Sequence, residues 1–262
     1  MNGYFELAWS DVIISLVLVG ALAAVAIIER LGLLRDVIVG TVRTFVQLLL
    51  IGYVLKFVFD LSQWYWTVAM LAVMVGVATR TAAARDERGA PGRYRVAGVA
   101  ITSGVVVTML TVVGVVIRVR PWYTPEIVVP IAGMVIAATM NAVALTTTRF
   151  RSEMKQRRTT VDAALALGAT ATIASRAPLR EAMRAALIPT VNSLMIVGLV
   201  QLPGMMSGQI IAGVLSVQAV RYQIVVMYMI ACGAGVGSLV AALQMRRLFF
   251  TERHQIRGEM LG

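Results

Sequence analysis

The sequence predicts an all-α, polytopic integral membrane protein, and three observations support this. Of its 262 residues, 59% are hydrophobic and only 14% are charged, and the mean hydropathy is +0.82, outside the usual range for soluble domains. Apolar runs of spanning length recur along the chain, and the basic residues cluster between them. No low-complexity linker divides the sequence, so we expect one transmembrane domain covering residues 1–262.

The charge and cysteine content exclude several other classes. The net charge of +11 comes mostly from arginines in short clusters between apolar runs, which is the pattern that orients membrane helices. We therefore expect membrane lipid, and no nucleic acid, as a partner. The single cysteine, Cys232, excludes an intramolecular disulfide and a multi-cysteine metal site. Glu6 and Asp11 precede the first apolar core where a cleavable signal would need basic residues.

The number of spans follows from their length, because a helix needs about 20 apolar residues to cross the hydrocarbon core. Seven segments meet or approach that length: about 11–28, 37–59, 64–79, 96–117, 126–147, 187–202 and 221–243. With the N-terminus outside and the C-terminus inside, most of the 24 basic residues fall in inner connections, as the positive-inside rule requires. The opposite orientation would place them outside.

Polar residues inside the predicted spans are candidates for a substrate path. Arg43 and Gln47 in the second span share one helix face; either Arg43 extends to the inner interface, or it contacts a buried partner or a substrate. Asn141 in the fifth span is better explained by an interhelical hydrogen bond than by ligand contact. Small residues whose spacing favours close helix packing recur in two spans, namely Gly20 and Ala24 in the first and Gly233, Gly235 and Gly237 in the seventh.

The connection from Arg149 to Pro189, about 40 residues, is longer than a turn requires and is predicted to be a cytoplasmic element (residues 149–189) of helix, break and helix. Thr159 or Thr160 is expected to cap the first helix, which weakens near Gly168, and Ser175 is expected to cap the second. A basic stripe can face an acidic partner surface. The residues of this element expected to contact a partner are Asp162, Ala163, Ala164, Gly168, Arg176, Arg180 and Arg184.

The stretch Val197–Ile230 combines apolar character with Pro203, several glycines and polar side chains, so one uninterrupted lipid-facing helix is not expected. Two interpretations remain open: a plain outer turn, or a re-entrant outer element lining a translocation path. In the second case Met205 and Met206 would form an apolar plug at an outer gate. The candidates from this region and the helix before it are Asn192, Gln201, Met205, Met206, Gln209, Arg221 and Gln223.

Two motifs resemble those of known transporters. The segment Asp162–Gly168 (DAALALG) resembles the start of the coupling loop of bacterial ABC importer permeases. Nearly the whole chain resembles the Fet-type iron-export permeases, the YbbM-like family of ABC transporter membrane subunits. The residues that carry this resemblance are Arg43, Gln47-Leu48, Gly133-Met134, Asn141, Ala166–Ala169, Pro189, Asn192-Ser193, Val197–Ile210 and Ala219–Ile224.

This resemblance implies a multi-pass permease of the bacterial cytoplasmic (inner) membrane, a homodimer that pairs with a separate ABC ATP-binding subunit. ATP and Mg would be held by that subunit, and no cofactor is expected on this chain. The sequence agrees, because Lys56 and Lys155 do not lie in a phosphate-binding G-x-x-x-x-G-K-[ST] motif. No catalytic site is expected on the chain, so ATP hydrolysis would belong to the complex.

The substrate implied by the family is iron, or another metal or metal chelate. No Asp, Glu or His lies well inside a predicted span, so direct coordination of ferrous ion has little support and no metal site is predicted. Methionines could serve Cu(I), although packing is their usual role. A chelated, anionic or amphiphilic substrate fits Arg43, Gln47, Gln209 and Arg221 better. The alternative function is an ATP-independent transporter or channel for a small anionic or amphiphilic solute.

Overall fold

The computed structural model describes residues 8–61, 63–86, 90–117 and 120–258. These residues form helices and two isolated β-bridges, so the prediction of an all-α fold is confirmed. The chain divides into two compact units, Met1–Leu61 and Ser62–Gly262, and each is described by itself.

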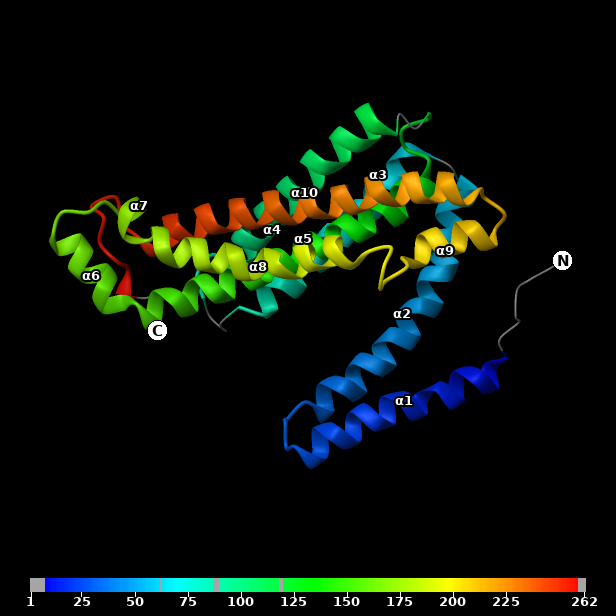
Figure 1. The fold of residues 1–262 in the computed structure, drawn as a ribbon, viewed down its shortest axis with the longest axis horizontal. Coiled ribbons are helices and arrows are strands. Elements are labelled where there is room, and N and C mark those ends of the chain that lie inside the picture. Colours follow the sequence, from blue (N-terminus) through cyan, green and yellow to red (C-terminus); the bar gives the residue numbers. More distant parts are fainter. Residues whose placement is uncertain (1–7, 62, 87–89, 118–119, 259–262) are drawn as a thin grey trace. The chain divides into compact units, whose positions relative to one another are not determined.

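The N-terminal unit is a helical hairpin of α1 (Trp9–Ile28) and α2 (Leu34–Leu61) (Figure 1). Helix α1 ends in two turn hydrogen bonds: the N–H of Arg30 donates to the Ile27 carbonyl (3.1 Å) and that of Leu31 to the Ala26 carbonyl (3.0 Å). These bonds satisfy carbonyls that a helix end leaves free. Trp9 packs edge-on against Phe45, with ring centroids 6.4 Å apart. The first two predicted spans are thus confirmed as helices.

Five long helices build the larger unit, and three short ones connect them (Figure 1). Helices α5 and α10 are central: α5 packs against α3, α4, α8 and α10, and α10 also packs against α4 and α8. The long helices are α3 (Trp64–Ala84), α4 (Arg93–Thr111, continued by a π-helical turn at Val112–Val116), α5 (Pro125–Gln156), α8 (Arg176–Ile196) and α10 (Ser216–Phe249). The short helices are α6 (Arg158–Ala166), α7 (Ala171–Ala174) and α9 (Gly204–Ile211).

Small residues set the spacing of α4, α5 and α10. A Cβ added to Gly104 would lie 2.7 Å from the Gly233 carbonyl oxygen, and one added to Gly237 would collide with the Thr139 methyl group. Lipid tails are as apolar as a leucine side chain, so close backbone approach is a main source of helix association in a membrane. The packing role predicted for Gly233 and Gly237 is confirmed, whereas a Cβ added to Gly20 or Gly235 would meet nothing within 4 Å.

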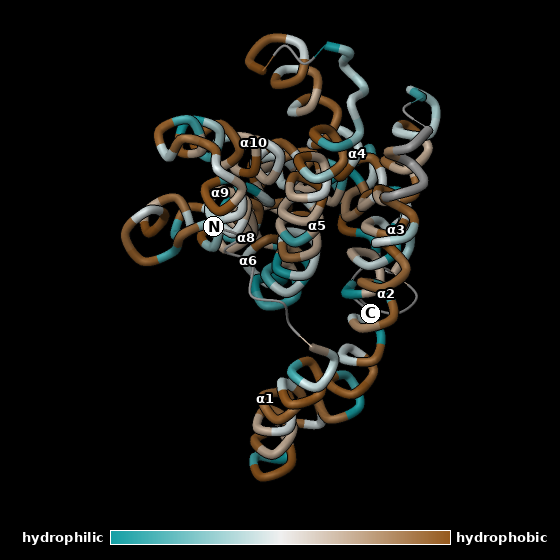
Figure 2. The backbone as a smooth tube through the Cα atoms, turned by 90° about the vertical axis from the view of Figure 1, so that its right-hand side faces the viewer, coloured by the Kyte–Doolittle hydropathy of each residue, from teal (hydrophilic) through white to brown (hydrophobic). Residues whose placement is uncertain are grey.

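In the described part of the chain, six helices are long and apolar enough to span a membrane. Their ranges are Trp9–Ile28, Leu34–Leu55, Trp64–Ala84, Arg93–Val116, Pro125–Gln156 and Ser216–Phe249. Most of α1 is coloured as hydrophobic in Figure 2. Helix α8 does not qualify, because its first half carries Arg176, Arg180 and Arg184. A multi-pass α-helical membrane protein is confirmed, and the count of seven spans and their orientation stay predictions.

Several predicted boundaries differ from the observed ones. The predicted span 187–202 is not one helix, because α8 ends at Ile196. Helix α5 continues past residue 147 through the basic run to Gln156, because that run contains neither Gly nor Pro. Only Arg157 separates α5 from α6, so Thr159 and Thr160 lie inside α6 and neither caps it. The Ser175 hydroxyl does not cap α8; it donates to the Ala171 carbonyl at 2.6 Å.

Candidate functional site

The backbone is irregular between α8 and α10, as the sequence predicted. Val197 and Gln201 form an isolated bridge, and the N–H of Gly198 donates to the Gln201 carbonyl at 2.9 Å. Gly198 has a φ of +83°, a left-handed conformation that costs glycine little. Pro203 then precedes α9 in extended conformation. Local hydrogen bonds therefore satisfy part of the backbone freed by the break, as membrane depth would demand.

Helix α9 ends in a second left-handed glycine. Gly213 has a φ of +91°, and its N–H donates to the Ile210 carbonyl at 3.0 Å while that of Val214 donates to the Gln209 carbonyl at 2.9 Å. This pair of bonds is the Schellman arrangement that closes a helix C-terminus. The chain can then reverse its direction and begin α10 within a few residues.

A cavity of about 550 Å³, which we call the break cavity, lies at this irregular segment. One face of α10 lines it at helical spacing, together with residues of α8, the 197–203 segment and α9. The lining residues are Leu194, Val197, Gly198, Leu202, Pro203, Met206, Val220, Gln223, Ile224, Met227 and Tyr228. The volume suits a small organic molecule, and the wall is almost entirely apolar.

Gln223 is the main polar feature of the break cavity. Its side chain is 6% exposed, and its Oε1 has no hydrogen-bond partner among the described residues. A buried amide oxygen without a partner is costly, so such groups in native proteins usually meet water, a ligand or a partner chain. The cavity therefore combines an apolar wall with one neutral polar group that can form a hydrogen bond to a ligand.

The structure brings together only two of the predicted substrate-path residues, since Met206 and Gln223 line the break cavity. Gln201, Met205, Gln209 and Arg221 lie in the same region but outside its lining, and Asn192 is exposed on α8. Arg43 and Gln47 are exposed on α2 of the N-terminal unit. Of the two methionines predicted to form an apolar plug, Met205 and Met206, only Met206 lines the break cavity.

Asn141 has a structural partner. Its Oδ1 accepts a hydrogen bond from Arg85 Nη1 at 2.9 Å, which joins α5 to the end of α3. This matches the interhelical bond favoured by the sequence. A second such bond, between the hydroxyls of Thr146 and Ser238 (2.8 Å), joins α5 to α10.

The predicted cytoplasmic element (residues 149–189) has the expected break. Gly168 has a φ of +87° and closes α6 with the same Schellman pair, since its N–H donates to the Leu165 carbonyl (3.0 Å) and that of Ala169 to the Ala164 carbonyl (3.0 Å). The turn leaves two large apolar side chains in the open: Leu167 is 90% exposed and Ile173 is 65% exposed.

Charges surround this exposed apolar tip. Asp162 pairs with Arg158 along α6 at 3.6 Å, while Ala163 is exposed and Ala164 is half-buried. Arg176, Arg180 and Arg184 are exposed on α8, which leaves the basic stripe free for a partner. The C-terminal segment returns to this region, where His254 Nδ1 accepts a hydrogen bond from the Ala171 N–H at 3.4 Å.

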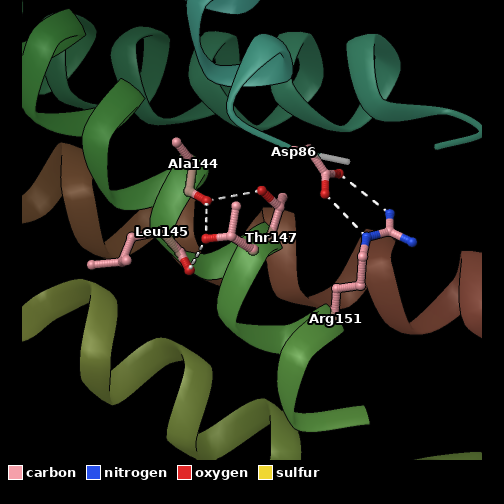
Figure 3. Close-up of polar contacts among 6 residues, drawn as sticks. Asp86, Ala144, Leu145, Thr147 and Arg151 are labelled. Carbon is pink, nitrogen blue, oxygen red and sulfur yellow. Dashed lines mark hydrogen bonds and ion pairs between the residues drawn. The ribbon is translucent and has the colours of Figure 1, made fainter. Parts of the chain in front are cut away.

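A buried ion pair that the sequence did not predict connects α5 to the end of α3. Arg151 donates through Nε to Asp86 Oδ1 at 3.0 Å and through Nη2 to Oδ2 at 3.3 Å (Figure 3). The side chains are 4% and 3% exposed. The Arg151 guanidinium also lies 5.4 Å from the Phe249 ring centroid, and Phe249 stacks edge-on with Phe150. Charge neutralisation and stacking together allow Arg151 to be buried.

The described residues contain no group of three or more His, Cys, Asp or Glu side chains that could hold a metal ion. The break cavity has amide, phenol and thioether groups in place of the imidazoles and carboxylates typical of ferrous sites. Its chemistry fits an apolar or shielded molecule better than a bare divalent cation.

The fold and the break cavity define a multi-pass, α-helical membrane protein with a ligand-sized hollow at a helix break. Residues 9–250 match the Uncharacterised protein family (UPF0014), and the chain belongs to this family. It is 35% identical to the "Probable iron export permease protein FetB" of Escherichia coli over 246 residues, 92% of this chain and 93% of the relative. The resemblance to Fet-type permeases found in the sequence is confirmed.

Other relatives carry different names. The chain is 35% identical to "Protein ALUMINUM SENSITIVE 3" of Arabidopsis thaliana over 234 residues, covering 89% of this chain and 84% of the relative. It is 32% identical to "UPF0014 membrane protein slr1647" of Synechocystis over 255 residues, or 97% and 98% of the two chains. No solved structure matches the chain significantly.

Proposed function

We propose that this chain is the membrane-spanning permease subunit of an ABC transporter, working as a homodimer with two separate ATPase subunits. The complex would export iron, another metal or a metal chelate across the bacterial inner membrane. ATP and Mg would bind the ATPase subunits. The resemblance to a named iron export permease supports this proposal.

The exposed tip of the element between α5 and α8 is the single observation that carries the coupling assignment. Leu167, at 90% exposure, lies on a turn closed by Gly168, beside a stripe of three exposed arginines on α8. Burial of such a leucine in a cleft of a partner would remove a large apolar surface from water and so stabilise the interface, and the exposed arginines could contact acidic residues around it. Residues 158–184 would therefore be the docking element for the ATPase.

A matched pair of variants tests this assignment. Leu167→Ser removes the apolar tip, and Leu199→Ser changes a leucine of equal exposure, 89%, at the helix break outside that element. The wild-type chain should copurify with its ATPase and stimulate ATP hydrolysis in proteoliposomes. We expect Leu167→Ser to weaken binding about tenfold or more, with Leu199→Ser close to wild type. If both variants bind the ATPase equally well, the coupling assignment is wrong. Transport by the chain without any ATPase would favour the ATP-independent alternative.

The substrate class follows from the break cavity. Its apolar wall and the Gln223 amide fit the outer surface of a chelate or an amphiphile, so we expect stimulation of ATP hydrolysis by lipophilic metal chelates and not by the free ion. A panel of free metals, chelates and lipids with the reconstituted complex measures this. Transport of free metal that is unchanged in Arg43→Ala, Arg221→Ala and Gln223→Leu would contradict it.

A further inference from the structure

Two more hollows lie where α4 begins and α10 ends, with volumes of about 330 and 170 Å³. Arg95, Gln244 and Arg247 line both of them. The larger hollow is otherwise lined by apolar side chains, among them Val99 and Val240. We call these three shared residues the donor triad.

A glycine brings the two helix ends together. Gly92 precedes α4 with a φ of +72°, and a Cβ added there would lie 3.0 Å from Leu248 Cδ1. The start of α4 therefore lies directly against the last turn of α10. Arg95, in the first turn of α4, is thereby placed beside Arg247, in the last turn of α10.

The donor triad offers hydrogen-bond donors without an acidic residue beside them in the described ranges. Among the residues that the structure describes, Gln244 Nε2 is buried without a hydrogen-bond partner, and the described lining of the two hollows contains no carboxylate. In the part of the chain that the structure describes, Arg95 and Arg247 show no ion pair. Arg95 and Arg247 are exposed, so solvent screens part of the repulsion between their like charges, while a buried amide N–H without an acceptor is costly. One anion with several acceptor oxygens would relieve both penalties.

We propose that the donor triad binds the phosphate group of an anionic phospholipid. Arg95 and Arg247 would provide charge-assisted hydrogen bonds to the phosphate oxygens, and Gln244 Nε2 would donate a third. The site lies at the ends of two helices that are candidate membrane spans, the depth at which lipid head groups are found. Val99, Val240 and Leu243 then provide an apolar wall for the start of an acyl chain. Basic pockets of this kind on the inner side select anionic lipids.

Native mass spectrometry of the full chain in non-ionic detergent tests the proposal. The probes are phosphatidylglycerol, phosphatidylcholine with the same acyl chains, and inorganic phosphate, each at fixed ionic strength. The test variants are Arg95→Gln, Arg247→Gln, their double variant and Gln244→Leu. Arg246→Gln is the control, because it removes the same charge from the neighbouring position of α10 and does not line either hollow.

We expect one phosphatidylglycerol per chain, bound more tightly than phosphatidylcholine. Each arginine substitution should weaken binding about fivefold and the double variant about 25-fold, with Arg246→Gln near wild type. Phosphatidylglycerol should raise the thermal unfolding temperature of the wild type and of Arg246→Gln, and not that of the double variant, which separates lost binding from lost folding. If inorganic phosphate displaces phosphatidylglycerol at equal concentration, the donor triad binds soluble phosphate and not a lipid head group. This result would overturn the lipid assignment. Equal binding of the two lipids, or equal loss in Arg246→Gln, would overturn the site itself.

Discussion

Replacing Asp86 with asparagine should destabilise the helical bundle strongly, because it removes the carboxylate that pairs with the buried Arg151 guanidinium. The change keeps the size of the side chain and removes only the charge. Both side chains are almost fully buried, at 3% and 4% exposure, so bulk water solvates the pair poorly. The perturbation therefore isolates the electrostatic part of the contact between α5 and the end of α3.

The structure sets the size of the effect. At the 3.0 Å separation of Nε and Oδ1, Coulomb attraction is roughly 5 kcal/mol at an effective dielectric constant of about 20. Removing one partner of a buried pair typically costs about 3–5 kcal/mol. A polar hollow of about 370 Å³ adjoins the pair and is also lined by Arg85 and Lys155. Because water can enter such a space, we expect a cost near the lower end, about 3 kcal/mol.

Equilibrium unfolding in mixed SDS and non-ionic detergent micelles, followed by far-ultraviolet circular dichroism, measures the free energy of unfolding. The double variant Asp86→Asn/Arg151→Met should recover most of the loss, because it also removes the buried guanidinium charge whose carboxylate partner is lost in Asp86→Asn. The matched control is Glu153→Gln, which breaks the exposed Arg157–Glu153 pair (2.8 Å, 45% and 21% exposed) on the same helix and should cost about 0–0.5 kcal/mol. A cost for Asp86→Asn no larger than that of Glu153→Gln would refute the reasoning.

Two further predictions use the same assay. Gly237→Ala should lower the free energy of unfolding by about 1–3 kcal/mol, because the new methyl group collides with Thr139. The control Gly235→Ala should be neutral or stabilising, because nothing lies within 4 Å of its Cβ. Equal effects of the two variants would show that α10 does not pack as described. Gln223→Leu should raise the free energy of unfolding by about 1–3 kcal/mol, because it removes a buried oxygen that has no hydrogen-bond partner among the described residues; a loss of stability would show that this oxygen accepts a hydrogen bond in the isolated chain.

Features that depend on the local sequence were predictable. The helix break before α10 follows from Pro203 and the glycines around it, and the turn after α6 follows from Gly168, whose φ of +87° few other residues adopt at low cost. Most of the long helices were predictable because spanning length is fixed by the bilayer. Helices α5 and α10 extend beyond the predicted spans 126–147 and 221–243, because hydrophobicity marks the membrane core while a helix continues wherever no residue stops it. The error at α8 is of the opposite kind, since the helix ends at Ile196 and the predicted span continued to residue 202.

Features that depend on which helices are neighbours were not predictable. Asp86 and Arg151 are 65 residues apart, and each looks like an ordinary interfacial charge in the sequence. The donor triad likewise joins the start of α4 to the end of α10. The apolar helices of a membrane bundle have no polar face that marks their orientation, so only small residues hint at the contacts. Even these were ambiguous, since Gly233 and Gly237 pack closely while Gly235 faces open space.

The hydration of a divalent cation decides what the break cavity could accept. Hard cations give up their water shell only for a comparable set of oxygen or nitrogen ligands. The cavity lining provides the Gln223 amide, the Tyr228 hydroxyl and the thioethers of Met206 and Met227, too few hard donors for that exchange. Substrate metal would therefore have to arrive with its own ligands, whose outer surface an apolar wall can contact and a single amide can orient. This physical requirement, more than the name of any relative, is why the proposed substrate is a chelate and why Gln223 is the residue expected to distinguish one chelate from another.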